Sequence, residues 1–266
     1  MSEKDKEKDD YFEKSENFSV FRSIGGLITF STILPLNVYT TIEEMAKMTW
    51  FWPVIGGGVG AIALAISYFL LNILLIPSIA VAAIVYSFFI IFNGFHHLDG
   101  LIDIGDALMV HGSPEKKIAI MRDSLIGTGG IAIFFIVAII SVSSLVPILS
   151  AGIISAVLIC EMSAKMGLVS CAISSKAGSD GTGRFFIESM TILKFIGILA
   201  ITIAIAYILA GFIGIFGVLG GIFGGSYISY LGKKHFKIAT GDVLGASNEF
   251  GRMFSLIAML IAIIWI

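Results

Sequence analysis

Three aspartates stand at helical spacing in one polar stretch of the chain, FNGFHHLDGLIDIGDALMVHG, residues 92–112. Asp99 and Asp103 are four residues apart and Asp106 follows three residues later, so a helix would project all three carboxylates from one face. Three like charges on one face repel one another unless a cation neutralises them. Carboxylate oxygens that leave room for water and phosphate suit magnesium best, and the pattern therefore predicts a Mg²⁺ site. A solvated helix face is the alternative, which the mostly apolar residues between the aspartates disfavour.

Histidine adds a candidate acid or base to the same stretch. His97 lies two residues before Asp99, near the start of the expected helix, where it would contact a substrate phosphate or accept a proton. The proton acceptor is either His97 or one of the aspartates. His96 and His111 are interpreted as structural residues with hydrogen-bonded rings.

A membrane-embedded helical bundle must position these side chains. Of the 266 residues, 57% are hydrophobic and only 14% are charged, and the mean hydropathy is +0.97. Apolar runs long enough to cross about 30 Å of hydrocarbon recur along the chain, which predicts an all-α, polytopic transmembrane helical bundle. We expect a polar tail, residues 1–21, followed by a single integral-membrane catalytic domain, residues 22–266. About seven spans are predicted, near 53–71, 74–92, 126–148, 151–172, 191–210, 211–231 and 252–266.

The basic residues predict how the bundle is oriented. Residues 22–36 are too short and too polar to cross, so they are expected to form one re-entrant or interfacial N-terminal helix. The lysines and arginines of the short loops then fall on one side, which the positive-inside rule identifies as the cytoplasm. The sequence therefore predicts a multi-pass protein of the cell membrane, with the lipid bilayer as partner and the active site facing the cytoplasm. A net charge of −2 without a basic domain argues against nucleic acid as a partner.

Three blocks of sequence resemble the cobalamin synthase family, also called adenosylcobinamide-GDP ribazoletransferases. The first is the aspartate motif, which reads Asn-Gly-Phe-His-His-Leu-Asp-Gly-Leu-Ile-Asp-Ile-Gly-Asp over residues 93–106. The second is KKIAIMRDSLIGTGG, residues 116–130, and the third is ATGDVLGASNE, residues 239–249. Weaker similarities occur in FSTILPL at 30–36, FWPVIGGGVG at 51–60 and DGTGRFF at 180–186. Together these segments follow the family order through most of the chain.

The resemblance implies a Mg²⁺-dependent transferase of a late step in cobalamin biosynthesis. Its substrates would be adenosylcobinamide-GDP and α-ribazole or α-ribazole 5′-phosphate. A ribose hydroxyl would attack the corrinoid-side phosphorus, releasing GMP and forming adenosylcobalamin or its 5′-phosphate. Divalent cations held by carboxylates neutralise the charge on such a pyrophosphate. A homo-oligomer is compatible with the resemblance.

The resemblance also implies roles for individual residues. Asp99, Asp103 and Asp106 would bind the metal and, with His97, carry the catalysis. Both polar blocks, 93–124 and 239–249, interrupt apolar sequence and fall on the same side of the membrane, and a corrinoid nucleotide needs more surface than one helix offers. We therefore expect the two blocks to form one site with Asp242 near the three aspartates. Substrate contacts are expected at Asn93, Gly100, Asp123, Ser124, Thr240, Gly241, Asp242 and Asn248.

One departure concerns a mid-chain membrane helix, where the family usually carries an arginine. Here the chain has Glu161 and Lys165, which are four residues apart and can pair on one helix face. They are the two charged residues that lie clearly within a predicted span. We interpret them as an internal ion pair and do not count Lys165 as a site residue.

Two other functions use spaced acidic residues in a membrane protein. A CDP-alcohol phosphatidyltransferase would carry an Ala-Arg pair after the second aspartate and glycine of its motif, and none follows Asp99 and Gly100. A cation transporter would place acidic residues at mid-membrane on several helices. The transferase is therefore the preferred function.

Overall fold

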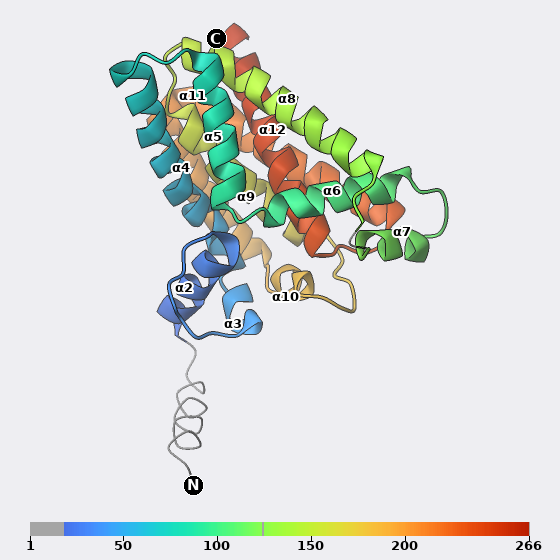
Figure 1. Ribbon diagram of the computed structural model, residues 1–266. Helices are drawn as coiled ribbons and strands as arrows, with labels where there is room; N and C mark the ends of the chain where they lie inside the picture. Colours follow the sequence, from blue (N-terminus) through green and yellow to red (C-terminus); the bar gives the residue numbers. More distant parts are fainter. Residues whose placement is uncertain (1–18, 124, 266) are drawn as a thin grey trace, which may run out of the picture.

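The computed structural model describes residues 19–123 and 125–265, and these residues are folded mainly into helices (Figure 1). Within the described ranges, strand-like pairing is limited to an isolated parallel bridge between Ala177 and Ala239. The expected all-α class is confirmed. Residues 1–18 of the predicted polar tail lie outside the described ranges, and Val20 and Phe21, which we had assigned to that tail, belong to the first helix described.

Long apolar helices form the body of the bundle (Figure 1). By length and composition five of them can cross a membrane, and α5 joined to the bent helix that follows it is a sixth candidate. The first candidate comprises a 3₁₀ turn (Thr49–Phe51), α4 (Trp52–Tyr68) and a π-helical turn (Phe69–Ile73). The other helices of the body are α5 (Ser78–Phe92), α8 (Thr128–Ser150), α9 (Ala156–Ser174), α11 (Ile192–His235) and α12 (Gly241–Trp265).

Helix α11 is a helical hairpin. It has 44 residues, about twice the length that crosses a bilayer, and its backbone turns at Gly211, where φ is +57°. Beyond this turn the chain folds back, because both halves reach the same part of α9. The Thr202 hydroxyl lies 3.9 Å from the Met166 sulfur, and a Cβ on Gly221 would lie 2.4 Å from the Ser163 carbonyl oxygen. The predicted division near Gly211 is confirmed, so α11 alone is long enough to supply two passes.

Small residues let α11 approach the central helix α9 closely. Nearly all of α9 is buried, and a Cβ added to Gly225 would overlap the main chain of Gly167. Helices in membranes gain most of their association energy from such close packing, because lipid removes the hydrophobic driving force. The glycine clusters of α11 are thus explained by contact with α9.

A double hydrogen bond ends α5 and turns the chain through 94° into α6 (His96–Met109). The Gly94 N–H donates to the Ile91 carbonyl at 3.0 Å and the Phe95 N–H donates to the Ile90 carbonyl at 3.1 Å. Gly94 and Phe95 both have positive φ, as this helix-ending motif requires at Gly94. Helix α6 therefore runs at a steep angle to α5 and carries the aspartate motif with it.

Short helices gather at this same end of the bundle (Figure 1). They are α2 (Val20–Ser31), α3 (Ile42–Ala46), α7 (Pro114–Met121) and α10 (Gly183–Glu188). Helix α2 has 12 residues, too few to cross a bilayer, and exposes apolar side chains such as Phe21. Its length and surface agree with an interfacial or re-entrant helix.

The last helix differs from the prediction. We expected the span to begin near residue 252, but α12 begins at Gly241. Residues 241–251 looked like a polar loop because they include Asp242, Asn248 and Glu249. They are helical because α12 packs against α6 and α9, where Asn248 and Glu249 find polar partners in the interior.

Candidate active site

A cavity of about 260 Å³ opens at the end of the bundle where α6 crosses the first turns of α12. Five segments that are distant in sequence bound it: Phe30 on α2, Trp52 on α4, the start of α6, residues 182–186, and the start of α12. Leu168 of α9 closes one side. The predicted residues His97, Asp99, Gly241 and Asp242 all line this cavity.

The two predicted blocks meet at Gly100 and Asp242. A Cβ on Gly100 would lie 2.6 Å from the main-chain oxygen of Asp242, so only glycine allows this contact between α6 and α12. The contact brings Asp242 to the face of α6 that carries Asp99 and Asp103. Burial, and then repulsion from Asp99, Asp242 and Asp106, raises the pKa of Asp103 to about 7. The site is thus an assembly of like charges.

Asp106 has different partners from the other two aspartates of the motif. One carboxylate oxygen accepts the Gly127 N–H at 2.7 Å, and the other accepts the Gly130 N–H at 2.8 Å. These amides belong to the start of α8, where unpaired N–H groups and the helix dipole favour an anion. Asp106 therefore anchors α6 to α8, and its predicted part in metal binding stays a prediction.

His97 is buried beneath the carboxylates, with 7% of its surface exposed. Its Nε2 lies 3.4 Å from the Lys165 ammonium, which also donates to Asn93 Oδ1 at 3.2 Å. Burial, and then the Lys165 charge, lowers the pKa of His97 well below its usual value, so the ring is neutral. The predicted substrate contact Asn93 is buried, and its amide nitrogen donates to Phe89 O and to Glu161, each at 2.9 Å.

Lys165 belongs to a buried network of four charges. The predicted pair with Glu161 is confirmed at 3.7 Å, and Glu161 also accepts a hydrogen bond from Arg252 Nε at 2.9 Å. Arg252 in turn pairs with Glu249, three residues earlier on α12. Our expectation that only Glu161 and Lys165 were charged within a span was wrong, because α12 buries two more charges. Two acids and two bases compensate one another in this interior.

Aromatic rings form the closed part of the cavity. The Phe186 ring lies 4.8 Å from Trp52 and 5.2 Å from Phe30, measured between centroids, and Phe30 stacks on His96 at 6.3 Å. Two polar atoms of the lining are buried without a partner among the described residues: Trp52 Nε1 and His97 Nδ1. An unpaired buried donor costs about 1–3 kcal/mol, so a ligand that paired with these atoms would remove that cost.

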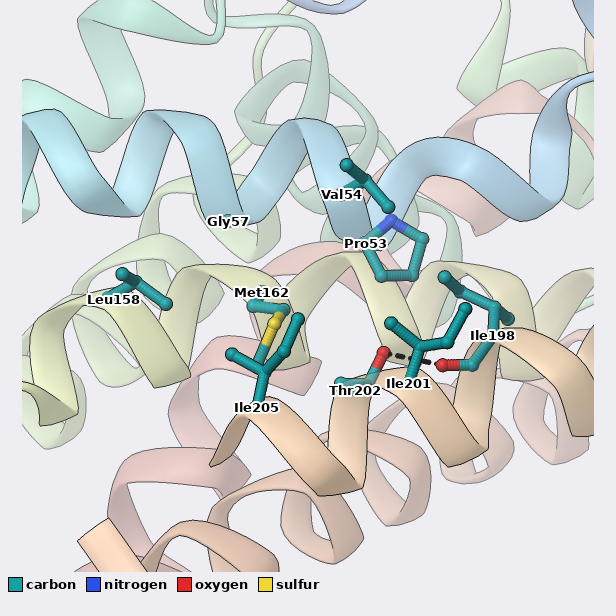
Figure 2. A pocket seen from close by; sticks show the side chains of 9 residues that line it. All are labelled: Pro53, Val54, Gly57, Leu158, Met162, Ile198, Ile201, Thr202 and Ile205. Atoms are coloured by element: carbon teal, nitrogen blue, oxygen red, sulfur yellow. Dashed lines mark hydrogen bonds between the residues drawn. The ribbon is translucent and has the colours of Figure 1, made fainter. Parts of the chain in front are cut away.

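A second cavity, of about 220 Å³, lies between α4, α9 and α11 and has a different character (Figure 2). Apolar side chains such as Ile201 and Met162 line it. Its one hydroxyl, that of Thr202, already donates to the Ile198 carbonyl at 2.8 Å (Figure 2). Nothing in this lining can hold a charged substrate, so the aspartate-rich cavity is the candidate active site.

A smaller cavity of about 180 Å³ adjoins the candidate site and shares Gly241 and Asp242 with it. The predicted residue Thr240 lines it and donates to Asp242 at 3.1 Å. Arg122, rather than the predicted neighbour Asp123, reaches this cavity and pairs with Asp180 at 3.3 Å. The predicted contact Asn248 is buried and donates to Glu249. Ser124, another predicted contact, is outside the described residues.

The donor set suits a divalent cation only if the substrate completes it. In the ranges 19–123 and 125–265, no three acidic, imidazole or thiol side chains converge closely enough to hold an ion alone. Asp99, Asp103 and Asp242 are nevertheless hard oxygen donors, and none forms a salt bridge with another described residue. Magnesium is commonly held by one or two carboxylates together with substrate phosphates. The three carboxylates fit a site of this kind.

The residues that sequence reasoning missed come from the weakly matching segments. Phe30, Trp52 and Phe186 form the aromatic wall, and each lies in one of the three short similarities at 30–36, 51–60 and 180–186. The sequence signal for these residues was that the three short similarities follow the family order. Arg252 gave no local signal, because its partner Glu161 is 91 residues away along the chain.

Comparison with known proteins identifies the family of the chain. The sequence profile of cobalamin-5-phosphate synthase matches residues 23–260. Curated relatives named adenosylcobinamide-GDP ribazoletransferase include one from Methanosarcina barkeri, 28% identical over 86% of this chain and 88% of the relative. Those of Caldanaerobacter subterraneus and Picrophilus torridus are each 31% identical, over 84% and 88% of this chain and 91% and 95% of the relative. No solved structure matches significantly. Because the profile and these relatives extend over most of its length, the chain belongs to the cobalamin-5-phosphate synthase family.

Proposed function

We propose that this protein transfers the cobinamide-phosphate group of adenosylcobinamide-GDP to α-ribazole or α-ribazole 5′-phosphate, late in cobalamin biosynthesis. A ribose hydroxyl attacks the corrinoid-side phosphorus and forms the new P–O bond. The pyrophosphate bond breaks, and its bridging oxygen leaves with GMP. The observation that carries the proposal is the group of carboxylates Asp99, Asp103 and Asp242, which form no salt bridge with another described residue. Two distant blocks bring Asp99 and Asp242 to one cavity, and Asp103 lies close enough to both to be repelled by them.

These carboxylates fit a role in holding Mg²⁺ against the pyrophosphate. Asp99 and Asp103 come from α6, and Asp242 comes from the first turn of α12. When bound, the cation neutralises charge on the pyrophosphate and on the leaving phosphate. The contact at Gly100 fixes the spacing between the two helices, so a shift of α12 would separate the donors.

The proton of the attacking hydroxyl passes to a carboxylate rather than to His97. His97 is buried, and its Nε2 already faces the Lys165 ammonium. Asp99 lines the cavity and is exposed to it, so it is the nearest available acceptor. His97 serves instead as a neutral, fixed ring below the substrate.

The active site faces the cytoplasm in this proposal. Helices α3, α7 and α10 lie at one end of the bundle (Figure 1). Lys47 directly follows α3, Lys116 and Lys117 belong to α7, and α10 lines the polar cavity, so the positive-inside rule assigns that end to the cytoplasm. A cysteine introduced at Ser113 should react in inside-out vesicles. Reaction with a membrane-impermeant reagent added to intact cells would reverse the orientation.

Product analysis with purified protein in lipid nanodiscs tests the function. With adenosylcobinamide-GDP, α-ribazole and Mg²⁺, the joined corrinoid and GMP should appear in equal amounts, and a chelator should stop both. Parallel reactions with α-ribazole 5′-phosphate determine which acceptor is preferred. GMP release without joining, or turnover only with a CDP-alcohol and a lipid acceptor, would contradict the proposal.

A further inference from the structure

The candidate cavity has the features of a binding site for a particular kind of base. Resting on the proposed function, we infer that it binds the base of the acceptor nucleoside, a flat bicyclic ring with a bare acceptor nitrogen and no hydrogen-bond donors. The buried indole N–H of Trp52 donates to that nitrogen. The guanine of the second substrate binds elsewhere. This assigns the base of α-ribazole, a substituted benzimidazole, to the aromatic end of the cavity.

The shape and lining of the cavity favour a flat apolar ring. Its closed part is made by Trp52 and Phe186, which are 3% and 1% exposed, and by Leu168. Phe30 stacks on the outer side, against His96 and Phe186. Stacking of a base on aromatic side chains contributes about 1–3 kcal/mol. The cavity of about 260 Å³ has room for one nucleoside and not for a corrinoid.

The polar atoms at the closed part can only donate. The indole Nε1 of Trp52 is a donor and never an acceptor. An ammonium likewise only donates, so Lys165 requires His97 Nε2 to be the acceptor, and the neutral ring must carry its proton on Nδ1. Both Nε1 and Nδ1 lack a partner among the described residues. The two N–H groups together suit a ligand that presents an acceptor and no hydrogen of its own.

This donor pattern distinguishes the two bases of the reaction. A benzimidazole nucleoside has one unsubstituted ring nitrogen, which accepts, and its remaining edge is apolar. Guanine also presents acceptors, at N7 and O6, but its N–H groups at N1 and N2 need acceptors of their own. The side chains of the closed part, Trp52, Phe186 and Leu168, offer none, so these N–H groups would lose their hydrogen bonds to water there. With the benzimidazole at the closed part, the ribose faces the mouth of the cavity, where Asp99 and Asp242 lie.

The inference is tested by comparing wild type and a Trp52 variant, each with two ligands that differ in the ring nitrogen. Affinities of the nanodisc-embedded protein are measured by isothermal titration for α-ribazole and for its indole counterpart, in which C–H replaces the bare nitrogen. Wild type should prefer α-ribazole by about tenfold, the value of one good hydrogen bond. Trp52→Phe should retain the stacking surface yet reduce that preference to about threefold or less. The control Trp50→Phe, a tryptophan outside the cavity lining, should keep the full preference.

The outcomes separate this inference from the proposed function. Equal affinities of wild type for α-ribazole and its indole counterpart overturn the inference, even if turnover is normal. Competition between guanosine and α-ribazole for the cavity, with guanosine binding also weakened by Trp52→Phe, overturns it as well. Absence of turnover together with the expected ligand preference would instead contradict the function and leave the base-binding site in place. Because the ligand-side change needs no variant, a poorly folded Trp52→Phe protein does not prevent the test.

Discussion

The protein holds two groups of charges that differ in how they are balanced. At the end of the bundle, Asp99, Asp103 and Asp242 face one another without a cationic partner within salt-bridge distance among the described residues. Deeper in the bundle, Glu161 and Glu249 are paired with Lys165 and Arg252, and all four side chains are at most 2% exposed.

The difference indicates that the paired, buried charges stabilise the fold, whereas the three aspartates bind a ligand. Buried charges are tolerated when each has a partner, and removing one partner leaves an uncompensated charge in the interior. Unpaired carboxylates at a cavity do not stabilise the fold, so their retention is explained by what they bind. Asp106 shares features of both groups. It belongs to the aspartate motif, but its carboxylate is paired with the main-chain N–H groups at the start of α8.

Breaking the deep group should have the largest effect on stability. Arg252→Met leaves Glu161 and Glu249 facing each other without their shared cation, and should lower the free energy of unfolding by about 3–5 kcal/mol. Arg184→Met is the matched control, since Arg184 forms an exposed pair with Glu188 at 2.9 Å and should contribute less than about 1 kcal/mol. Unfolding in mixed detergent micelles measures both. Equal losses in the two variants would show that the buried network is not structural.

Neutralising the unpaired group should affect turnover far more than stability. Asp103→Asn preserves size and removes one charge, so the variant should insert and fold normally while losing about a hundredfold or more in turnover. Glu115→Gln, at an exposed acid on neighbouring α7, should leave both properties unchanged. A folded Asp103→Asn protein with wild-type turnover would show that Asp103 is not needed for the reaction.

Asp106 should respond in the opposite way to Asp103. In Asp106→Asn one oxygen still accepts an N–H, but the charge at the start of α8 and the second hydrogen bond are lost. We expect a loss of about 1–3 kcal/mol in stability, and a loss of turnover that follows the fraction unfolded. Thermal unfolding and turnover measured on the same samples distinguish the two effects. Unchanged stability with abolished turnover would restore Asp106 to the metal site.

The pH dependence of stability should show a small effect of the same cluster. The folded-state pKa of Asp103, about 7, exceeds its value of 3.8 in the unfolded chain. Its contribution is therefore present at low pH and is lost as pH rises through about 7. Without divalent cations, the melting temperature of wild type should fall relative to Asp103→Asn as pH rises from about 5 to 8. Parallel pH profiles for the two proteins would contradict the repulsion.

The sequence predicted what depends on local composition and spacing. Apolar length predicted the spans, including the division of α11 at Gly211, and helical spacing placed Asp99 and Asp103 on one helix. Gly100 was singled out from the sequence as a substrate contact, and in the structure it lets the main chain of Asp242 approach α6 closely. These features follow from residues that are close in sequence or from chain length alone.

Features that depend on distant packing could not be predicted. Polar residues 241–251 looked like a loop, because nothing local shows that Arg252 and Glu249 enclose Glu161 of another helix. The same limit applies to Asp106, since its partners are main-chain amides of α8, which carry no sequence signature. The role of Lys165 beside His97 likewise appears only when α6 and α9 are placed together.

Manganese binding tests the central distinction most directly. Mn²⁺ replaces Mg²⁺ at oxygen sites and reports its environment by electron paramagnetic resonance. With adenosylcobinamide-GDP present, and after correction for binding to the substrate alone, wild type and Asp106→Asn should each bind about one Mn²⁺. Asp103→Asn should bind it at least about tenfold more weakly. Equal binding by wild type and Asp103→Asn would contradict the account, because the unpaired carboxylates would then have no part in holding the cation.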